Sequence, residues 1–310
     1  MKYGKYLAML SACALCAWVA LAPVRAWADV KINATNFPDE NFRRWVKENA
    51  AGGKNILTDA QIAVVEEMDL SFGEISSLKG IERFTALKDL ACWSNNLAEL
   101  DMSRNVALEI LRCNGNELTR LNLPKNAVLN GLYCDQNELA TLDLSGLPDL
   151  YALSCRYNGI KTLDVSHNPA LAELDCWGNE ITSLDLSKNV ALTKLNCLEN
   201  PIKKLDLSKN RELSEASLPE TATVLLPGGD KIAMRDFKVT KHKDGKYRLN
   251  LSKYGAKIGE VCAEPEGEDE IDVKSVKGVH TFAPFAGKLI VPYKLRGDDE
   301  LNLILFIEGE

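Results

Sequence analysis

Six cysteines recur at a strict spacing of 21 residues, and they are the side chains here with the most varied chemistry. They are Cys92, Cys113, Cys134, Cys155, Cys176 and Cys197. Thiols in such a row can form disulfides, hold a metal ion as thiolates, or lie buried as small apolar side chains. The distances that each chemistry requires decide between these three uses.

Stacking geometry favours buried thiols. If successive units follow one another as parallel strands do, equivalent side chains lie about 4.8 Å apart. A disulfide needs Cβ atoms about 3.8 Å apart with converging bonds, and a tetrahedral zinc ion needs clustered ligands and not a linear row. We therefore predict six free thiols in a core, with no metal and no other cofactor. Cys262 lies outside the row and is predicted to be a lone free thiol.

The cysteines belong to a longer repeat that determines the fold. From residue 87 to residue 213, six units follow the pattern L-x-x-L-x-C-x-x-N-x-[LI]-x-x-L-[DN]-[LMV]-[SP]-x-[NL]-x-x without gaps. A fixed period in this range is typical of a solenoid. The alternation of Leu and Cys predicts one short parallel strand per coil. A second alternation, as in residues 184–187, predicts another strand on the opposite side of the coil.

The repeat resembles that of bacterial leucine-rich repeat proteins of the 21-residue subclass called IRREKO. Just before it, residues 75–81 (ISSLKGI) resemble the longer internalin-type repeat. The resemblance implies a curved, mainly β solenoid with parallel strands, on a secreted or surface protein that binds macromolecules.

The flanking segments predict the domain organisation. Residues 1–28 are basic, then apolar, and end in Ala-Trp-Ala, which predicts a signal peptide cleaved after Ala28. Acylation at Cys13, as in a lipoprotein, is the alternative. Residues 29–65 are predicted to form a helical N-terminal cap and residues 66–86 a transitional repeat. After the six units at 87–213, residues 214–310 are predicted to form a sandwich-like β domain with a hairpin at 237–251.

Two polar columns accompany the cysteines. An asparagine follows each cysteine by three residues, and we predict that these side chains turn inward and bond to backbone groups, as in leucine-rich repeats. The acidic column comprises Asp101, Asp143, Asp164, Asp185 and Asp206, and the basic column three residues further on comprises Arg104, Lys125, His167, Lys188 and Lys209. We predict that the aspartates cap turns and are compensated by these cations. Calcium binding is the alternative.

Composition excludes several classes of function. The formal net charge of −7 makes the protein a poor ligand for nucleic acid or an anionic membrane. No segment after residue 28 has the length and apolar character of a membrane span, so we expect no membrane insertion of the mature chain. The three histidines are scattered, and no nucleophile elbow, paired metal motif or phosphate loop is present. We predict no catalytic residues, no enzyme activity and a monomer.

The informative positions are those that vary while their neighbours repeat. Residues just before and after each cysteine should point outward from the strand, and several are Tyr, Trp or Arg, the residue types that dominate binding hot spots. We call the predicted ligand-binding residues the outer strip: Trp93, Arg112, Tyr133, Asp135, Arg156, Tyr157, Asp175 and Trp177. The alternative is that they are ordinary solvated strand residues with aromatic stacking between coils.

The outer strip leads to the first hypothesis of function. It predicts a secreted or cell-surface interaction or adhesion protein whose partner is a host or bacterial surface protein or glycan. One alternative is a hydrolase or inhibitor module with its activity in the C-terminal β domain. The other is a purely structural component of the cell envelope.

Overall fold

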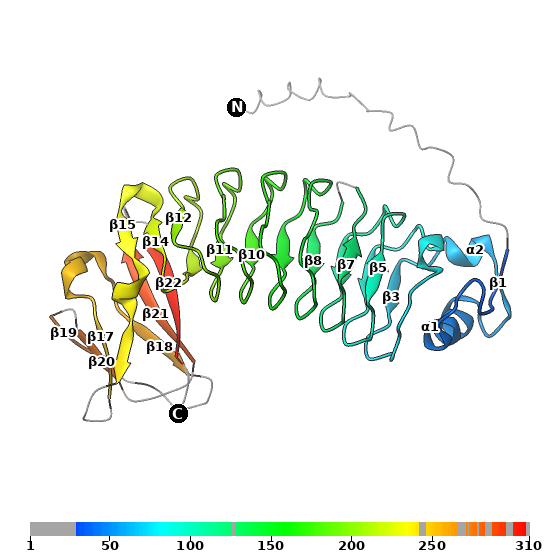
Figure 1. Cartoon of the computed structure of the whole chain (residues 1–310), viewed down its shortest axis with the longest axis horizontal. Helices are drawn as coiled ribbons and strands as arrows, with labels where there is room; N and C mark the ends of the chain where they lie inside the picture. Colours follow the sequence, from blue (N-terminus) through cyan, green and yellow to red (C-terminus); the bar gives the residue numbers. More distant parts are fainter. Residues whose placement is uncertain are drawn as a thin grey trace, which may run out of the picture.

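A row of short coils forms the centre of the molecule (Figure 1). The computed structural model describes residues 29–125, 128–241, 246–265, 271, 273–277, 279–282, 287–295 and 300–307. The predicted signal peptide, with Cys13 and Ala28, lies outside the described residues. Within them, no helix is both long enough and apolar enough to cross a bilayer.

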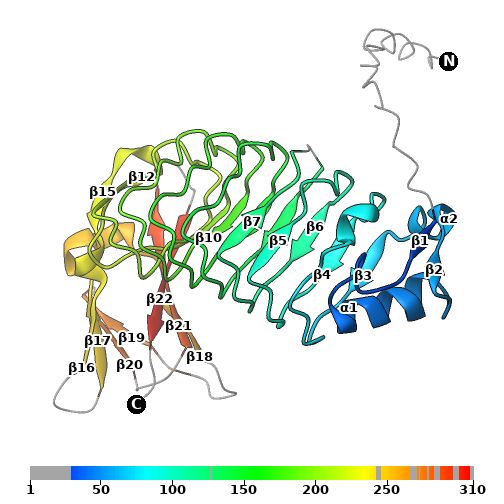
Figure 2. The same cartoon turned by 45° about the vertical axis from the view of Figure 1, so that its right-hand side comes forward.

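One 11-stranded sheet runs along the whole row (Figure 2). Successive strands are parallel and in register, so that Leu111 pairs with Leu132 and Leu174 with Leu195. The described parallel strands are β3 (Glu67–Asp69), β4 (Asp89–Ala91), β6 (Ile110–Arg112), β8 (Gly131–Tyr133), β9 (Ala152–Ser154), β10 (Glu173–Asp175), β11 (Lys194–Asn196) and β13 (Glu215–Ser217). Each 21-residue repeat thus forms one coil and advances the sheet by one strand spacing. This confirms the predicted, mainly β solenoid.

The second predicted strand of each coil forms only near the two ends of the solenoid. There β5 (Glu99–Asp101) pairs with β7 (Arg120–Asn122), and β12 (Lys204–Asp206) pairs with β14 (Thr223–Leu225). Between them, residues 184–187 form no strand, although Leu184 and Leu186 are buried. The prediction for this segment was wrong because its alternation of apolar residues reflects burial of one side and not ladder hydrogen bonds.

The cysteines lie in the core between the two sides of the coils. All six in the row are fully buried, and all are free thiols, as predicted. Burial raises the pKa of Cys92 and Cys197 to about 12 and that of the four thiols between them well above the usual value. Because the thiolate is the reactive form, these thiols are inert in the folded protein. Cys262 is exposed.

The asparagine column bonds to the backbone of two coils. Asn137 Nδ2 donates to the carbonyl of Cys113 at 3.0 Å and to that of Cys134 at 3.1 Å, and its Oδ1 accepts from Leu118 N–H at 3.0 Å. The same contacts recur along the column, which confirms the prediction. We did not predict a second column of asparagines, in which each side-chain Nδ2 donates to a backbone carbonyl of the preceding coil. Its members are Asn105, Asn168, Asn189 and Asn210.

The aspartate column caps turns. In Asp101, Asp143, Asp164, Asp185 and Asp206, Oδ1 accepts from the backbone N–H of the serine two residues later at 2.9–3.0 Å. The serine hydrogen bonds, reinforced by the basic column, hold the pKa of each carboxyl below its usual value. Turn capping is therefore confirmed.

The first coil is closed by a small cap that is helical only in part. Its two short strands, β1 (Val30–Lys31) and β2 (Ile56–Leu57), are antiparallel. Helix α1 (Glu40–Trp45) continues as the π-helical turn η1 (Val46–Ala50), and α2 (Asp59–Ile62) begins with a capping box at Thr58. The fully buried rings of Phe37 and Phe42 contact edge to face and cover the end of the core. The transitional coil contains the 3₁₀ turn η2 (Ile81–Arg83).

The solenoid sheet continues past residue 213. Strand β13 keeps the 21-residue register with β11, and the buried Leu218 takes the place of the next cysteine. Strand β22 (Glu300–Ile307) then pairs with β13 in parallel, followed by β21 (Gly287–Lys294) and β18 (Cys262–Pro265) in antiparallel order. One sheet of the predicted C-terminal sandwich is thus continuous with the solenoid.

The other C-terminal elements form a separate four-stranded sheet. Its order is β16 (Val239–Lys241), β17 (Tyr247–Asn250), β20 (Val279–Phe282) and β19 (Lys274–Val276), all antiparallel. The pairing of β16 with β17 confirms the predicted hairpin, and residues 242–245 between the two strands lie outside the described residues. Shorter elements connect the sheets: β15 (Lys231–Ala233) and the 3₁₀ turns η3 (Pro227–Gly229), η4 (Met234–Phe237) and η5 (Ser252–Lys257).

Candidate binding face

The outer strip lies on one side of the 11-stranded sheet. Three of its residues, Arg112, Tyr133 and Asp175, end strands β6, β8 and β10. Four follow a buried cysteine by one residue (Trp93, Asp135, Arg156 and Trp177), and Tyr157 follows one by two. Because the strands are in register, these positions stack from coil to coil as rows.

Exposure separates one member of the strip from the others. Trp93 and Tyr157 are exposed, and Arg112, Tyr133, Arg156, Asp175 and Trp177 are half-buried. Asp135 is only 6% exposed. It therefore offers little surface to a partner, unlike the predicted role.

Asp135 is instead the centre of a hydrogen-bond network. Its carboxylate accepts from Asn114 Nδ2 at 2.7 Å, from Ser154 Oγ at 2.5 Å and from the backbone N–H of Arg156 at 2.8 Å. Charge-assisted bonds of this kind are stronger than neutral ones. Asp135 thus positions the side chains around it, across three coils.

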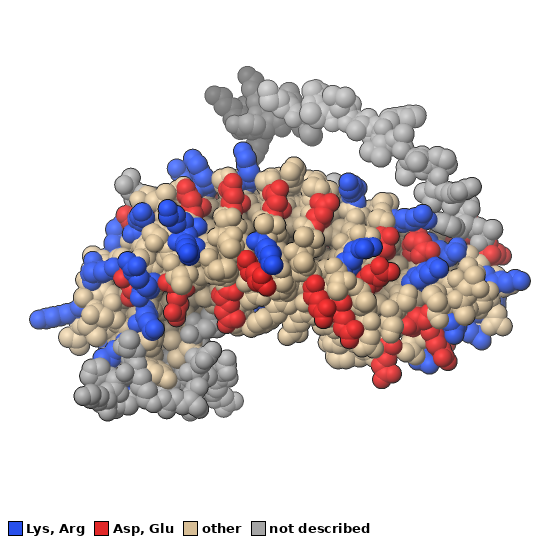
Figure 3. All heavy atoms as spheres, viewed as in Figure 1, with Lys and Arg blue, Asp and Glu red and all other residues tan. Residues whose placement is uncertain are grey.

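The charges of the outer strip are balanced within the strip and its neighbours. Arg112 Nη1 lies 2.6 Å from Asp89 Oδ1, and the guanidinium is 6.0 Å from the centre of the Tyr133 ring. Arg156 Nε lies 3.9 Å from carboxylate oxygens of both Asp135 and Asp175. Burial raises the pKa of Asp175, so its carboxyl group ionises less readily than an exposed aspartate does. The face therefore presents polar groups without a strong field. Acidic and basic side chains also intermingle over the face of the solenoid visible in Figure 3.

Two pairs of aromatic rings stand on this face. Tyr157 and Trp177 have ring centres 5.2 Å apart at an angle of 45°. Phe72 and Trp93 have ring centres 4.3 Å apart at 69°. Sequence reasoning missed Phe72, because the transitional coil is one residue longer and lacks the cysteine that marks the outward positions.

A column of left-handed backbone conformations runs beside the strip. The position two residues after each cysteine has positive φ, as has Phe72, its equivalent in the transitional coil. The members are Phe72 (φ 55°), Ser94 (54°), Gly115 (62°), Gln136 (52°), Tyr157 (49°), Gly178 (67°) and Glu199 (49°). Non-glycine residues pay about 1–3 kcal/mol for this conformation. The glycines at 115 and 178 are the sequence signal for this column.

Sequence comparison agrees with the fold. Internalin J of Listeria monocytogenes serotype 4b (strain F2365) is 40% identical to the chain over 73 residues, which are 22% of this chain and 8% of that protein. The chain is an internalin-like leucine-rich repeat protein. No family model matches it.

Solved structures of three Listeria monocytogenes proteins also match this internalin-like protein. The functional domain of InlJ, described as including a cysteine ladder, has a TM-score of 0.32 at 18% identity, covering 92% of this chain and all of that one. InlF has a TM-score of 0.37 at 18% identity, with 63% of this chain and 72% of that chain covered. Internalin C2 has a TM-score of 0.47 at 19% identity, with 64% and 90% covered.

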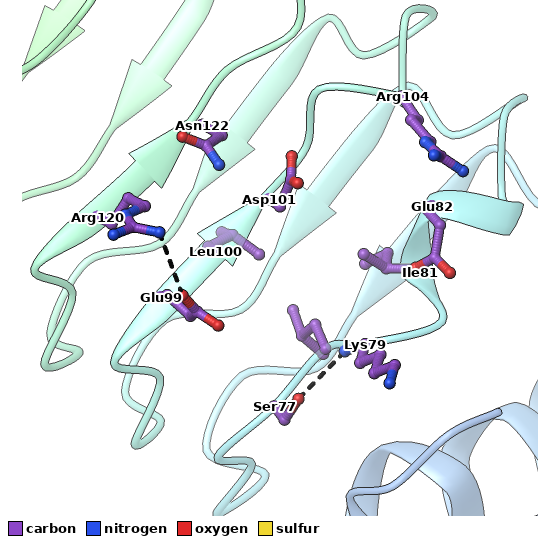
Figure 4. A pocket seen from close by; sticks show the side chains of 11 residues that line it. Ser77, Lys79, Ile81, Glu82, Glu99, Leu100, Asp101, Arg104, Arg120 and Asn122 are labelled. Atoms are coloured by element: carbon purple, nitrogen blue, oxygen red, sulfur yellow. Dashed lines mark hydrogen bonds and ion pairs between the residues drawn. The ribbon is translucent and has the colours of Figure 1, made fainter. Parts of the chain in front are cut away.

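The internalin-like protein also has a groove on the opposite side of its first coils (Figure 4). Residues 77–80, just before η2, form no strand beside β5, and the groove beside them has a volume of about 480 Å³. Three cations and three anions line it: Lys79, Arg104, Arg120, Glu82, Glu99 and Asp101. Arg120 Nη1 lies 4.0 Å from Glu99 Oε2, both well exposed. Such a balanced, solvated lining indicates no particular ligand.

One contact in the C-terminal domain bears on the hydrolase alternative. Ser275 Oγ lies 2.7 Å from Nδ1 of His280, opposite it in the β19–β20 pair. Burial lowers the pKa of His280, and its Nε2 has no hydrogen-bond partner among the described residues. A serine nucleophile needs a base that a third group orients. Among the residues described, no cluster of three or more His, Cys, Asp and Glu side chains suited to a metal occurs either.

Proposed function

We propose that this internalin-like protein is a secreted or cell-surface interaction protein that binds a surface protein or glycan through the outer strip. The observation that carries the proposal is the row of half-buried and exposed Trp, Tyr and Arg side chains on consecutive parallel strands. Aromatic and arginine side chains supply most of the energy of known interfaces.

The framework beneath the strip supports this function. Strand register fixes the backbone, the asparagine columns hold the turns, and Asp135 fixes side chains of neighbouring coils. A surface that is already ordered loses little conformational freedom on binding. The strip therefore suits an extended partner that contacts several coils at once.

The test is a combined substitution within the strip. In residues 29–310, Arg112, Tyr133, Arg156 and Trp177 are changed together to alanine, and binding is measured on arrays of host proteins and glycans and on cells. We expect affinity to fall at least 100-fold, since each hot-spot residue contributes about 2 kcal/mol or more.

A matched control removes four exposed side chains elsewhere. Arg104, Arg120, Lys161 and Val190 lie outside the strip, and the last three are more than half exposed. Their combined alanine variant should bind like the unchanged protein. Thermal unfolding of both variants establishes that they are folded. A folded strip variant with undiminished binding would falsify the proposal.

A further inference from the structure

The two aromatic pairs on the binding face have the same arrangement of residues. In each, the ring of the left-handed residue of one coil packs against the Trp that follows the cysteine of the next coil. Phe72 contacts Trp93 in this way, and Tyr157 contacts Trp177. Phe72 is 68%, Tyr157 42% and Trp93 37% exposed. The rings are therefore available to a ligand.

The pairing is selective among the coils. An aromatic side chain occupies the left-handed position only where the next coil supplies a Trp. The other coils carry non-aromatic residues at the same two positions: Ser94 with Asn114, Gly115 with Asp135, Gln136 with Arg156, and Gly178 with Leu198. Aromatic residues are thus kept in pairs although bulky side chains disfavour this backbone conformation.

Gly178 makes room for one of the pairs. A Cβ atom at this position would lie 2.7 Å from Cδ1 of Tyr157. The Tyr157 ring therefore rests on the backbone of the next coil and packs at a tilt against Trp177. The chain holds this ring against the surface in a fixed orientation.

The two pairs are related by translation along the solenoid. From Trp93 to Trp177 the sheet advances by four strands, β4 to β10, which corresponds to about 19 Å at the usual strand spacing. Two equivalent subsites related by translation match a ligand that itself repeats along its length. A linear polymer has this property, and a compact protein epitope does not.

The polar groups between the pairs favour a carbohydrate polymer. Asn114 and Gln136 offer amides that both donate and accept, and Asp175 offers a carboxylate that accepts. Sugar hydroxyls donate and accept, and the C–H face of a pyranose ring stacks on aromatic rings. A proline-rich helix lacks the N–H donors that the carboxylate would need. The balanced charges of the strip favour an uncharged chain, and the acidic protein repels nucleic acid.

We propose that the Phe72–Trp93 and Tyr157–Trp177 pairs are two subsites for an uncharged linear polysaccharide that runs along the solenoid axis, across the strands. This inference rests on the proposed function of the outer strip and adds Phe72 to it. One sugar ring stacks at each pair, and the polar side chains between the pairs bind hydroxyls.

Glycine substitutions test the subsites without removing the fold. Phe72→Gly and Tyr157→Gly delete a ring while supplying the residue that best tolerates positive φ. Ser94→Gly and Glu199→Gly make the same backbone change in the same column without removing a ring. Each variant of residues 29–310 is titrated by calorimetry with uncharged oligosaccharides of about two to twelve sugar units, chosen from a glycan array, and with oligoproline.

We expect affinity to rise steeply once an oligosaccharide is long enough to contact both pairs, because the second contact becomes intramolecular. Either ring deletion should abolish that rise and weaken the long oligosaccharides at least 10-fold, while the two control variants bind normally and all four fold. Binding that is unchanged by both ring deletions overturns the inference, as does oligoproline binding that the deletions abolish.

The outcomes also separate this inference from the proposed function. If a protein or a charged glycan binds and the four-residue strip variant loses it, while no uncharged glycan binds, the inference is wrong and the proposed function stands. If the strip variant keeps every interaction of the unchanged protein, both are wrong.

Discussion

Single side chains in each coil satisfy the backbone of the next, and Asn137 is a clear example. It is 8% exposed, and its amide bonds to three backbone groups in two neighbouring coils. We predict that Asn137→Ala lowers the free energy of unfolding by at least about 2 kcal/mol, because it leaves buried backbone groups without partners.

Urea unfolding of the two proteins measures this change. Asn130→Ala is the control, since that side chain is exposed and, within the described part of the chain, makes only a long 3.5 Å hydrogen bond to the Val128 carbonyl. It should shift stability by less than about 0.5 kcal/mol. Equal effects of the two substitutions would contradict a structural role for the column.

The predictable residues were those that recur. Cysteine and asparagine appear in all six units, so their burial followed from stacking geometry alone. Asp135 occurs once, and its burial depends on Asn114 and Ser154 in the two neighbouring coils. Such a network depends on which residues meet across coils at one place, and the repeat pattern does not contain that information.

The turn that follows each strand combines backbone conformation with packing. At Gly178 both requirements meet: φ is 67°, and an added Cβ would clash with Tyr157. We predict that Gly178→Ala lowers the free energy of unfolding by more than about 1 kcal/mol.

Gly159→Ala is the matched control for this turn. Its φ is not positive, and the nearest atom to an added Cβ is the Leu139 carbonyl at 3.8 Å, an ordinary contact. This variant should be neutral or slightly stabilised, because alanine restricts the unfolded chain. Thermal melts compare the two variants, and a stable Gly178→Ala protein would show that the Tyr157 ring moves freely.

Strands were predictable on one side of the coils and not on the other. The alternation of Leu and Cys predicted the long sheet correctly. One side of this sheet packs in the core, and the other carries rows of side chains that face outward. Leu184 and Leu186 alternate equally well, yet their segment forms no strand. The alternation of apolar residues identifies which side chains are buried. Whether the segment also forms strand hydrogen bonds depends on its distance to the next coil.

Across the whole solenoid the aspartate column makes stability depend on pH. Hydrogen bonds from the serines hold the pKa of Asp143, Asp164, Asp185 and Asp206 below their usual value. Groups with a lowered folded-state pKa stabilise the protein above the unfolded pKa, about 3.9, and lose this contribution as pH falls through the folded-state value.

We therefore predict that the fourfold Asp→Asn variant is less stable than the unchanged protein at pH 6 and that the difference shrinks as the pH falls below about 3.9, the unfolded-state pKa. Urea midpoints across this range measure it. Exposed glutamates serve as the control, with Glu117, Glu138, Glu220 and Glu260 changed to Gln to remove the same charge. A difference that does not shrink as the pH falls below about 3.9 would mean that the carboxylates do not act through their charge.

The C-terminal domain closes the far end of the solenoid. Because β22 pairs with β13 and β13 with β11, a chain ending at residue 213 would expose the edge of β11 and the core beside it. We predict that residues 29–213 self-associate, since open strand edges pair with one another, while residues 29–310 stay monomeric. Light scattering after gel filtration distinguishes the two, and a monomeric, folded 29–213 protein would contradict the capping role.

This closure was beyond the reach of sequence periodicity. The repeat motif fades at residue 214, yet Leu218 preserves the buried position and β13 the register. The partner of β13 comes from residues 300–307, far along the chain, and nothing local in either segment specifies their pairing. The fold of the coils was therefore predictable, and its termination was not.

Because the coils are strictly in register, the length of the binding face can change only in steps of one strand spacing. Removing one whole 21-residue unit between Trp93 and Trp177 would leave both aromatic pairs intact and bring them closer by one strand spacing, about 4.8 Å. Duplicating a unit would separate them by the same step. Unequal recombination between repeats can thus retune the span of the face in fixed increments, without any new side chain.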